Sequence, residues 1–142
     1  MMRAKYLVIH GAFLFAVPMY FCVYQIALLP GPLAAGSLGG PQSKTFYLMF
    51  LAIAMAQAIG GLLVPKFADR FCKKAPKTPQ QALLNRCIQQ DAFFEAPAVF
   101  GLIGVFLGLL PWQSYSLMAI SICLLAAGTV RVLAWADETE KL

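Results

Sequence analysis

Glu95 is the residue whose type and position most directly suggest chemistry, because it is a carboxylate inside a long apolar segment. Burying an ionisable side chain in such a segment is costly, so function is the default hypothesis for it. Further polar residues fall at a similar depth in the apolar segments, namely His10, Gln57 and Arg131, and Asp91 directly precedes the third segment as a further candidate for the cluster. We expect these residues to form one polar layer, in which Glu95 bonds to Gln57, His10 or Arg131. In the alternative interpretation, Glu95 and Arg131 reach water from the ends of their segments, and His10 is an ordinary hydrogen-bonded histidine.

The sequence lacks the other patterns that would indicate catalysis or metal binding. Its cysteines show no CxxC spacing (Cys22, Cys72, Cys87 and Cys123). A single histidine supplies neither a zinc set nor paired haem ligands, and no glycine-rich phosphate loop follows a strand. We therefore predict no catalytic site, no metal and no cofactor, and we expect that the protein is not an enzyme. An enzyme of lipid or quinone chemistry stays open as an alternative, and it would have to rest on the polar residues named above.

The composition indicates a membrane protein. Of the 142 residues, 61% are hydrophobic and 12% are charged, whereas a soluble domain is roughly 45–50% apolar and about 25% charged. The apolar residues form continuous runs, which favour helices over the alternating strands of a barrel. We predict an all-α integral membrane four-helix bundle in a single domain, 1–142. The predicted spans are about 6–29, 45–64, 92–110 and 115–132.

The basic residues predict the orientation of this bundle. With the N-terminus inside, ten of the eleven lysines and arginines fall on the cytoplasmic side, and only Lys44 falls outside. This asymmetry predicts a multi-pass protein of the inner (plasma) membrane with both termini cytoplasmic. We expect the first span to be retained, since it is too long for a signal peptide. The ten residues on the cytoplasmic side are Arg3, Lys5, Lys66, Arg70, Lys73, Lys74, Lys77, Arg86, Arg131 and Lys141.

A basic cytoplasmic loop, 66–90, is predicted to run into an extended third helix. Thr78 and Pro79 form a helix start, with Thr78 as N-cap and Pro79 at the first position. We expect one helix from Pro79 to Leu110, kinked at Pro97. The positive charge of 66–86 is expected to meet anionic lipid headgroups of the bilayer. Nucleic acid is not an expected partner, because no aromatic-basic module accompanies the charge.

Small residues on the second and third segments indicate close helix packing. A GxxxG pair on the third segment lets another helix backbone approach, and the second segment has similar small-xxx-small pairs. The partner helix belongs either to the same bundle or to another copy or subunit, and the sequence does not decide between these. The residues predicted to pack are Ala54, Ala58, Gly60, Gly101, Gly104 and Gly108.

Residues 92–103, AFFEAPAVFGLI, resemble the ion-carrying helix of rotary ATPase c subunits, the proteolipids. By this resemblance, Glu95 would take up H⁺ or Na⁺. In length and layout the chain also resembles small four-helix bacterial membrane proteins. It departs from the proteolipids in two respects. Glu95 lies only a few residues after the charged stretch 86–91, and the first segment lacks the family's glycine-rich pattern.

These departures favour a structural or accessory subunit of a membrane assembly, with other membrane subunits or a second copy as partners. A proteolipid-like protein that translocates protons or cations through Glu95 is the alternative.

Overall fold

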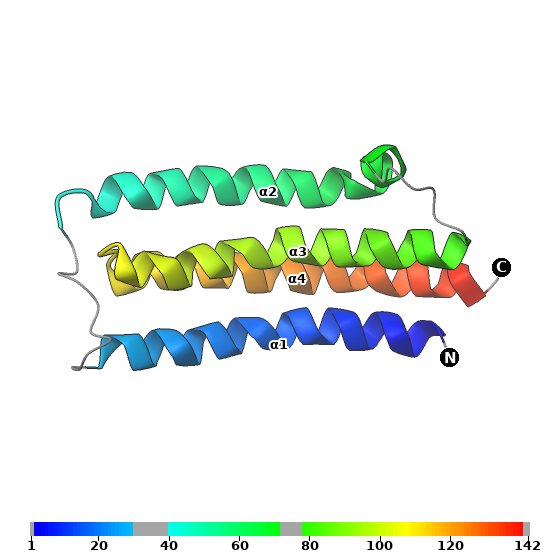
Figure 1. Cartoon of the computed structure of the whole chain (residues 1–142), viewed down its shortest axis with the longest axis horizontal. Helices are drawn as coiled ribbons and strands as arrows, with labels where there is room; N and C mark the ends of the chain where they lie inside the picture. Colours follow the sequence, from blue (N-terminus) through cyan, green and yellow to red (C-terminus); the bar gives the residue numbers. More distant parts are fainter. Residues whose placement is uncertain (1, 30–39, 72–77, 141–142) are drawn as a thin grey trace.

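The chain folds into four α-helices, and the all-α prediction is confirmed (Figure 1). The computed structural model describes residues 2–29, 40–71 and 78–140, and this part of the chain contains no strand. Each helix runs opposite to the one before it, so the start of the first and the end of the last lie at the same end of the bundle. The helices are α1 (Met2–Leu28), α2 (Ser43–Phe71), α3 (Pro79–Phe106) and α4 (Pro111–Glu140).

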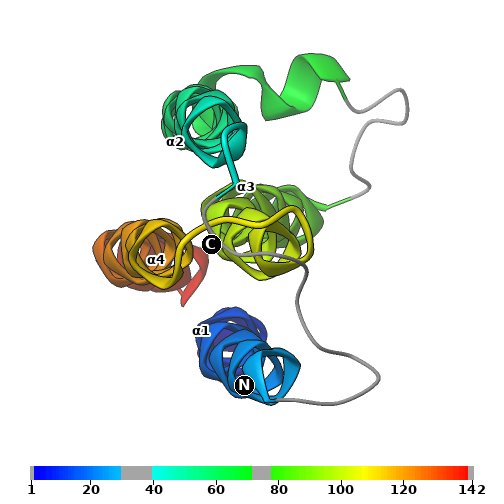
Figure 2. The ribbon, with the colours of Figure 1, turned by 90° about the vertical axis from the view of Figure 1, so that its left-hand side faces the viewer.

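Helix α3 lies at the centre of the arrangement. It packs against all three other helices, whereas α1 and α2 lie on opposite sides of the α3–α4 pair (Figure 2). Along most of its length, α3 is bordered by α2, α4 and α1 on three sides and by no described helix on the fourth. We refer to the face of α3 that carries the exposed Ala92, Ile103 and Phe106, and that packs against no other described helix, as the open stripe.

Three helices are long and apolar enough to cross a membrane, and α3 is not among them. The predicted span 92–110 is too long, because helix α3 ends at Phe106. Gly108, two residues later, adopts a left-handed φ of 79° and turns the chain. The 15 helical residues 92–106 cover roughly 22 Å, less than a hydrocarbon core of about 30 Å. The three candidate spans are Ala4–Leu28, Ser43–Leu63 and Pro111–Trp135.

The ends of the helices also correct the predicted loops. Helix α2 continues to Phe71, so the predicted loop 66–90 is helical over 66–71 and again from Pro79. Pro65 lies within α2, and the end of this helix turns away from its axis (Figure 2), since a proline removes a backbone hydrogen bond. Helix α4 begins at Pro111 and not near Tyr115. Residues 72–77 lie outside the described part of the chain.

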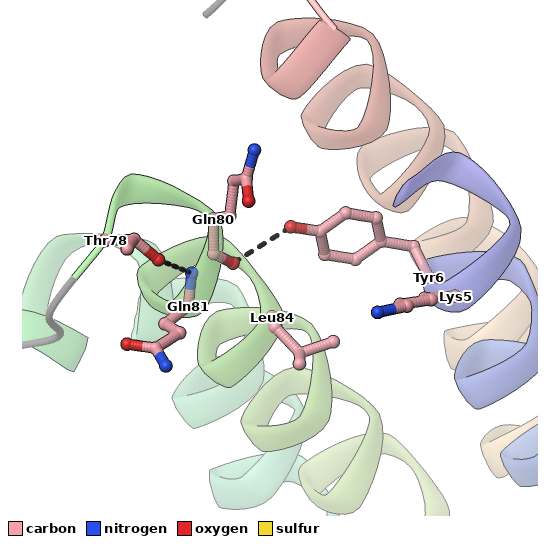
Figure 3. Close-up of a pocket in the computed structure, with 6 residues that line it drawn as sticks. All are labelled: Lys5, Tyr6, Thr78, Gln80, Gln81 and Leu84. Atoms are coloured by element: carbon pink, nitrogen blue, oxygen red, sulfur yellow. Dashed lines mark hydrogen bonds between the residues drawn. The ribbon is translucent and has the colours of Figure 1, made fainter. Parts of the chain in front are cut away.

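The predicted start of α3 is confirmed. Thr78 is the N-cap, and its hydroxyl accepts a hydrogen bond from the backbone N–H of Gln81 at 3.2 Å. Pro79 occupies the first turn, where a missing N–H costs nothing. The phenol of Tyr6 then donates to the carbonyl oxygen of Gln80 at 3.0 Å and ties α1 to this first turn (Figure 3).

The small residues on α2 and α3 contact neighbouring parts of the same chain. A side chain at Gly101 would stand 2.7 Å from the backbone oxygen of Ser114, and one at Gly104 would stand 2.6 Å from Leu109. Ala54 and Ala58 are buried in α2, and Gly60 lies against the ring of Phe93 on α3. Gly108 lies in the turn between α3 and α4, so it does not continue the predicted helix face.

The outer surface of the bundle is apolar. Large hydrophobic side chains are exposed on all four helices, among them Val8 and Val130 at 71% and Phe15 at 67%. Soluble monomers rarely expose contiguous apolar surface of this kind. The pattern is the one expected of helices whose outward faces contact lipid tails.

Candidate functional site

A buried polar centre joins three helices around Asp91. The carboxylate oxygen Oδ2 of Asp91, on α3, lies 2.9 Å from Nδ1 of His10 on α1. Nε2 of the same imidazole lies 2.8 Å from the hydroxyl of Thr129 on α4. Both ionisable side chains are enclosed, with 2% of His10 and 0% of Asp91 exposed. We refer to His10, Asp91 and Thr129 as the enclosed centre.

Counting hydrogen-bond donors assigns the protons of the enclosed centre. The Thr129 hydroxyl donates to the carbonyl oxygen of Leu125 at 3.2 Å, so it accepts from Nε2–H of His10. One further proton lies between Nδ1 and Asp91. Whether that proton resides on nitrogen or on oxygen, the pair has no net charge. Neutrality explains how two ionisable groups are tolerated deep in an apolar bundle.

Further polar side chains surround the enclosed centre. The thiol of Cys87, one turn before Asp91, lies 3.6 Å from Asp91 Oδ2 and can donate to it. Burial, together with the neighbouring Asp91, raises the pKa of the Cys87 thiol to about 12. Gln90 is fully buried, and neither atom of its side-chain amide has a hydrogen-bond partner among the described residues. Its amide fits against Gly128 of α4, where a side chain would stand 3.0 Å from the Gln90 nitrogen.

Glu95 lies one turn further along α3 in different surroundings. Its Oε1 accepts a hydrogen bond of 2.5 Å from the phenol of Tyr20 on α1. The side chain is partly exposed and lines an open cavity of about 220 Å³ together with Ala12, Phe13 and Ala16. This cavity is formed between α1 and the open stripe of α3. We refer to Glu95 and Tyr20 as the open site.

The predicted single polar layer is divided into separate contacts. Glu95 bonds to Tyr20 and to none of the three predicted partners. Arg131 donates to the carbonyl oxygen of Leu62 at 3.2 Å and so joins α4 to α2. Gln57 lines a cavity of about 270 Å³ with Gln89, Ala92 and Phe93, on the α2 side of α3. Of the predicted layer, only His10 and Asp91 are brought together.

Sequence reasoning missed Thr129, Cys87 and Tyr20. Cys87, Asp91 and Glu95 follow one another at intervals of four residues, which indicates a shared face of α3. That spacing could have identified Cys87. Thr129 and Tyr20 carry no such signal, because hydroxyl groups are common in apolar helices and their pairing depends on how the helices are rotated.

Metal binding finds no support in the described residues, which contain no cluster of three histidine, cysteine or acidic side chains. Comparison with known proteins also gives no assignment. No protein family, curated protein or solved structure matches this chain.

Proposed function

We propose that this chain is a multi-pass protein of the inner membrane, with both termini cytoplasmic, and that it serves as a structural or accessory subunit of a membrane assembly. Three helices apolar enough to span, together with the exposed apolar surface, support placement in a membrane. The distribution of lysine and arginine supports the orientation.

The observation that carries the proposal is the open stripe of α3. It consists of exposed side chains at helical spacing, including Ala92, Ile103 and Phe106. Polar groups flank it, with Glu95 on the α1 side and Gln57 on the α2 side. Helix α3 is the least suited of the four to contact lipid by itself, because it alone falls short of a span. A transmembrane helix of another subunit would cover the stripe and shield the partly exposed Glu95 from lipid.

Site-directed photocross-linking in intact membranes tests this proposal. A photoreactive residue at Ile103, on the stripe, is expected to form an adduct with another membrane protein. The matched control is Val130 on α4, which is 71% exposed outside the stripe and should contact only lipid. The mass of the adduct distinguishes a different subunit from a second copy. A stable lone monomer in mild detergent, with no adduct at Ile103, would contradict the proposal.

The alternative is a proton or cation carrier that uses Glu95. It is favoured by one observation, namely that the Glu95 carboxyl bonds to a phenol at the mouth of an open cavity. Such a group can release and take up an ion without opening the bundle. In proteoliposomes, the wild type would then carry protons or Na⁺ down an imposed gradient, and Glu95→Gln would not. Equal fluxes from the two proteins would rule this alternative out.

A further inference from the structure

The open site lies at the middle of the first candidate span. Ala16, which lines its cavity, has twelve residues of the span Ala4–Leu28 before it and twelve after it. At the rise of an α-helix, each half is roughly 18 Å long, which is more than half of a hydrocarbon core of about 30 Å. Once α1 crosses a membrane, lipid headgroups do not reach this depth. A ligand of the cavity therefore enters from the apolar phase.

The Glu95 carboxylate has a free acceptor oxygen at this cavity. Its Oε1 accepts from the Tyr20 phenol, while no described residue donates to Oε2 or pairs a cation with the carboxylate. Oε2 is also not one of the enclosed polar atoms that lack a partner, so it is accessible from outside the bundle. Carboxylates within membrane segments generally pair with another polar or charged group. An accessible carboxylate oxygen without a donor is suited to a cationic ligand.

The rest of the lining is apolar and favours one class of cation. The other lining side chains, those of Ala12, Phe13 and Ala16, offer no oxygen, whereas Mg²⁺ and Ca²⁺ take roughly six to eight oxygen ligands. One carboxylate and one phenol are too few for such an ion. A substituted ammonium needs a single carboxylate for its charge, and an aromatic ring attracts it further. Phe13 is the aromatic residue that lines the cavity beside Glu95.

The volume of the cavity fits a group of this kind. It is about 220 Å³, and an apolar cavity of about 150 Å³ in another protein binds benzene. A trimethylammonium or benzyl group therefore has room between Glu95 and the small side chains of α1. Since the cavity is open, longer apolar substituents can extend from it into the lipid.

We infer that the open site binds a lipophilic organic cation, a substituted ammonium whose charge lies at Glu95 and whose apolar groups lie against Phe13. Such a site goes beyond the proposed structural role. It rests on the proposed function only through the placement of α1 across a membrane.

Equilibrium dialysis of the full chain in a nonionic detergent tests the site, with radiolabelled benzyltrimethylammonium as the probe. We expect saturable binding of one cation per chain. Neopentylbenzene has the same shape, with carbon in place of the charged nitrogen. It should compete about tenfold more weakly, because it cannot pair with a carboxylate.

Matched variants assign the binding to the open site. Glu95→Gln should weaken binding about tenfold or more, whereas Asp137→Asn, which removes an exposed carboxylate near the end of α4, should not change it. Phe13→Leu should weaken binding about threefold through loss of the ring. Ala16→Leu, which fills the cavity, should also weaken it, while Ala134→Leu at an exposed position of α4 should not. Thermal unfolding verifies that each variant is folded.

Several results would overturn the inference. These are the absence of saturable binding, undiminished binding in Glu95→Gln, an equal loss in Asp137→Asn, and equal competition by neopentylbenzene. A loss of binding in NaCl that the same concentration of KCl does not cause would also overturn it, because Na⁺ would then be the ligand. Absence of the protein from carbonate-washed membranes would instead refute the proposed function. The two failures are therefore distinguishable.

Discussion

Asp91 and Glu95 stand one helical turn apart on α3, and their surroundings differ. Asp91 is fully buried between α1 and α4 and shares a proton with His10. Glu95 is partly exposed beside a cavity that opens between α1 and the uncovered stripe of α3, and its partner is a phenol. The two carboxyl groups are chemically alike, so the differences expected between them come from their environments.

This comparison separates two roles that the sequence alone does not distinguish. The enclosed centre joins side chains of three helices and so fixes how those helices pack. Loss of one member leaves a buried polar group without its partner. A group at an open cavity can bind a ligand or a partner without disturbing the core. We therefore assign the enclosed centre to stability and the open site to interaction.

The largest expected effect is that of removing Asp91. Asp91→Ala should lower the free energy of unfolding by about 3–5 kcal/mol, because His10 would then lack its buried partner. Denaturation in detergent, followed by circular dichroism, measures this loss. His10→Ala should cost a similar amount, and the double variant should cost less than the sum. A loss below about 1 kcal/mol for either single variant would contradict the structural role of the pair.

Cys87 reports how well the enclosed centre is shielded from water. With a pKa of about 12, its thiol stays protonated at ordinary pH, and only the thiolate reacts with maleimide. Cys22 and Cys123 are free and exposed, so the test uses a variant in which Cys22, Cys72 and Cys123 are all replaced by serine. Labelling of Cys87 in this folded variant should be negligible at pH 8 and should rise only toward strongly alkaline pH. Denatured chains provide the control and should label readily. Rapid labelling of the folded protein at pH 8 would show that this region is open.

The same substitution at two glycines compares the enclosed and open regions directly. A side chain at Gly128 would stand 3.0 Å from the Gln90 nitrogen and 3.2 Å from the Phe94 ring, whereas a side chain at Gly11 would meet nothing within 4 Å. Gly128→Leu should destabilise the fold by about 1–3 kcal/mol through overpacking. Gly11→Leu should change stability by no more than about 0.5 kcal/mol. Thermal unfolding of both variants measures the difference, and equal effects would contradict the described packing of α1 and α4.

The smallest expected effect on stability is that of Glu95→Gln. The glutamine oxygen can still accept the hydrogen bond from Tyr20, and the side chain is partly exposed. Its unfolding free energy should therefore lie within about 1 kcal/mol of the wild type, as measured in the same detergent. A loss as large as that of Asp91→Ala would show that Glu95 is also a structural residue.

Much of the fold follows from residue patterns. Continuous apolar runs predicted the helices, and Thr78 with Pro79 predicted where α3 begins, since both effects are local. The end of α3 was not predicted, because Gly108 can either continue a helix or turn the chain. That α3 is not a candidate span follows from its own composition and from where the helix ends, and not from its neighbours.

The candidate site was less predictable. Counting residues from the ends of the segments placed His10 and Glu95 at comparable depth, yet such counts do not determine how each helix is rotated about its axis. Rotation decides that His10 faces Asp91 and Thr129, and that Glu95 faces Tyr20. Contacts of this kind depend on the packing of all four helices together.

Carbodiimide labelling tests the central contrast most directly. Dicyclohexylcarbodiimide reacts with protonated carboxyl groups that it can reach from the apolar phase. After treatment of intact membranes, peptide mass mapping should find the label on Glu95 and none on Asp91. A label on Asp91 would contradict the assignment of one carboxyl to the enclosed centre and the other to the open site.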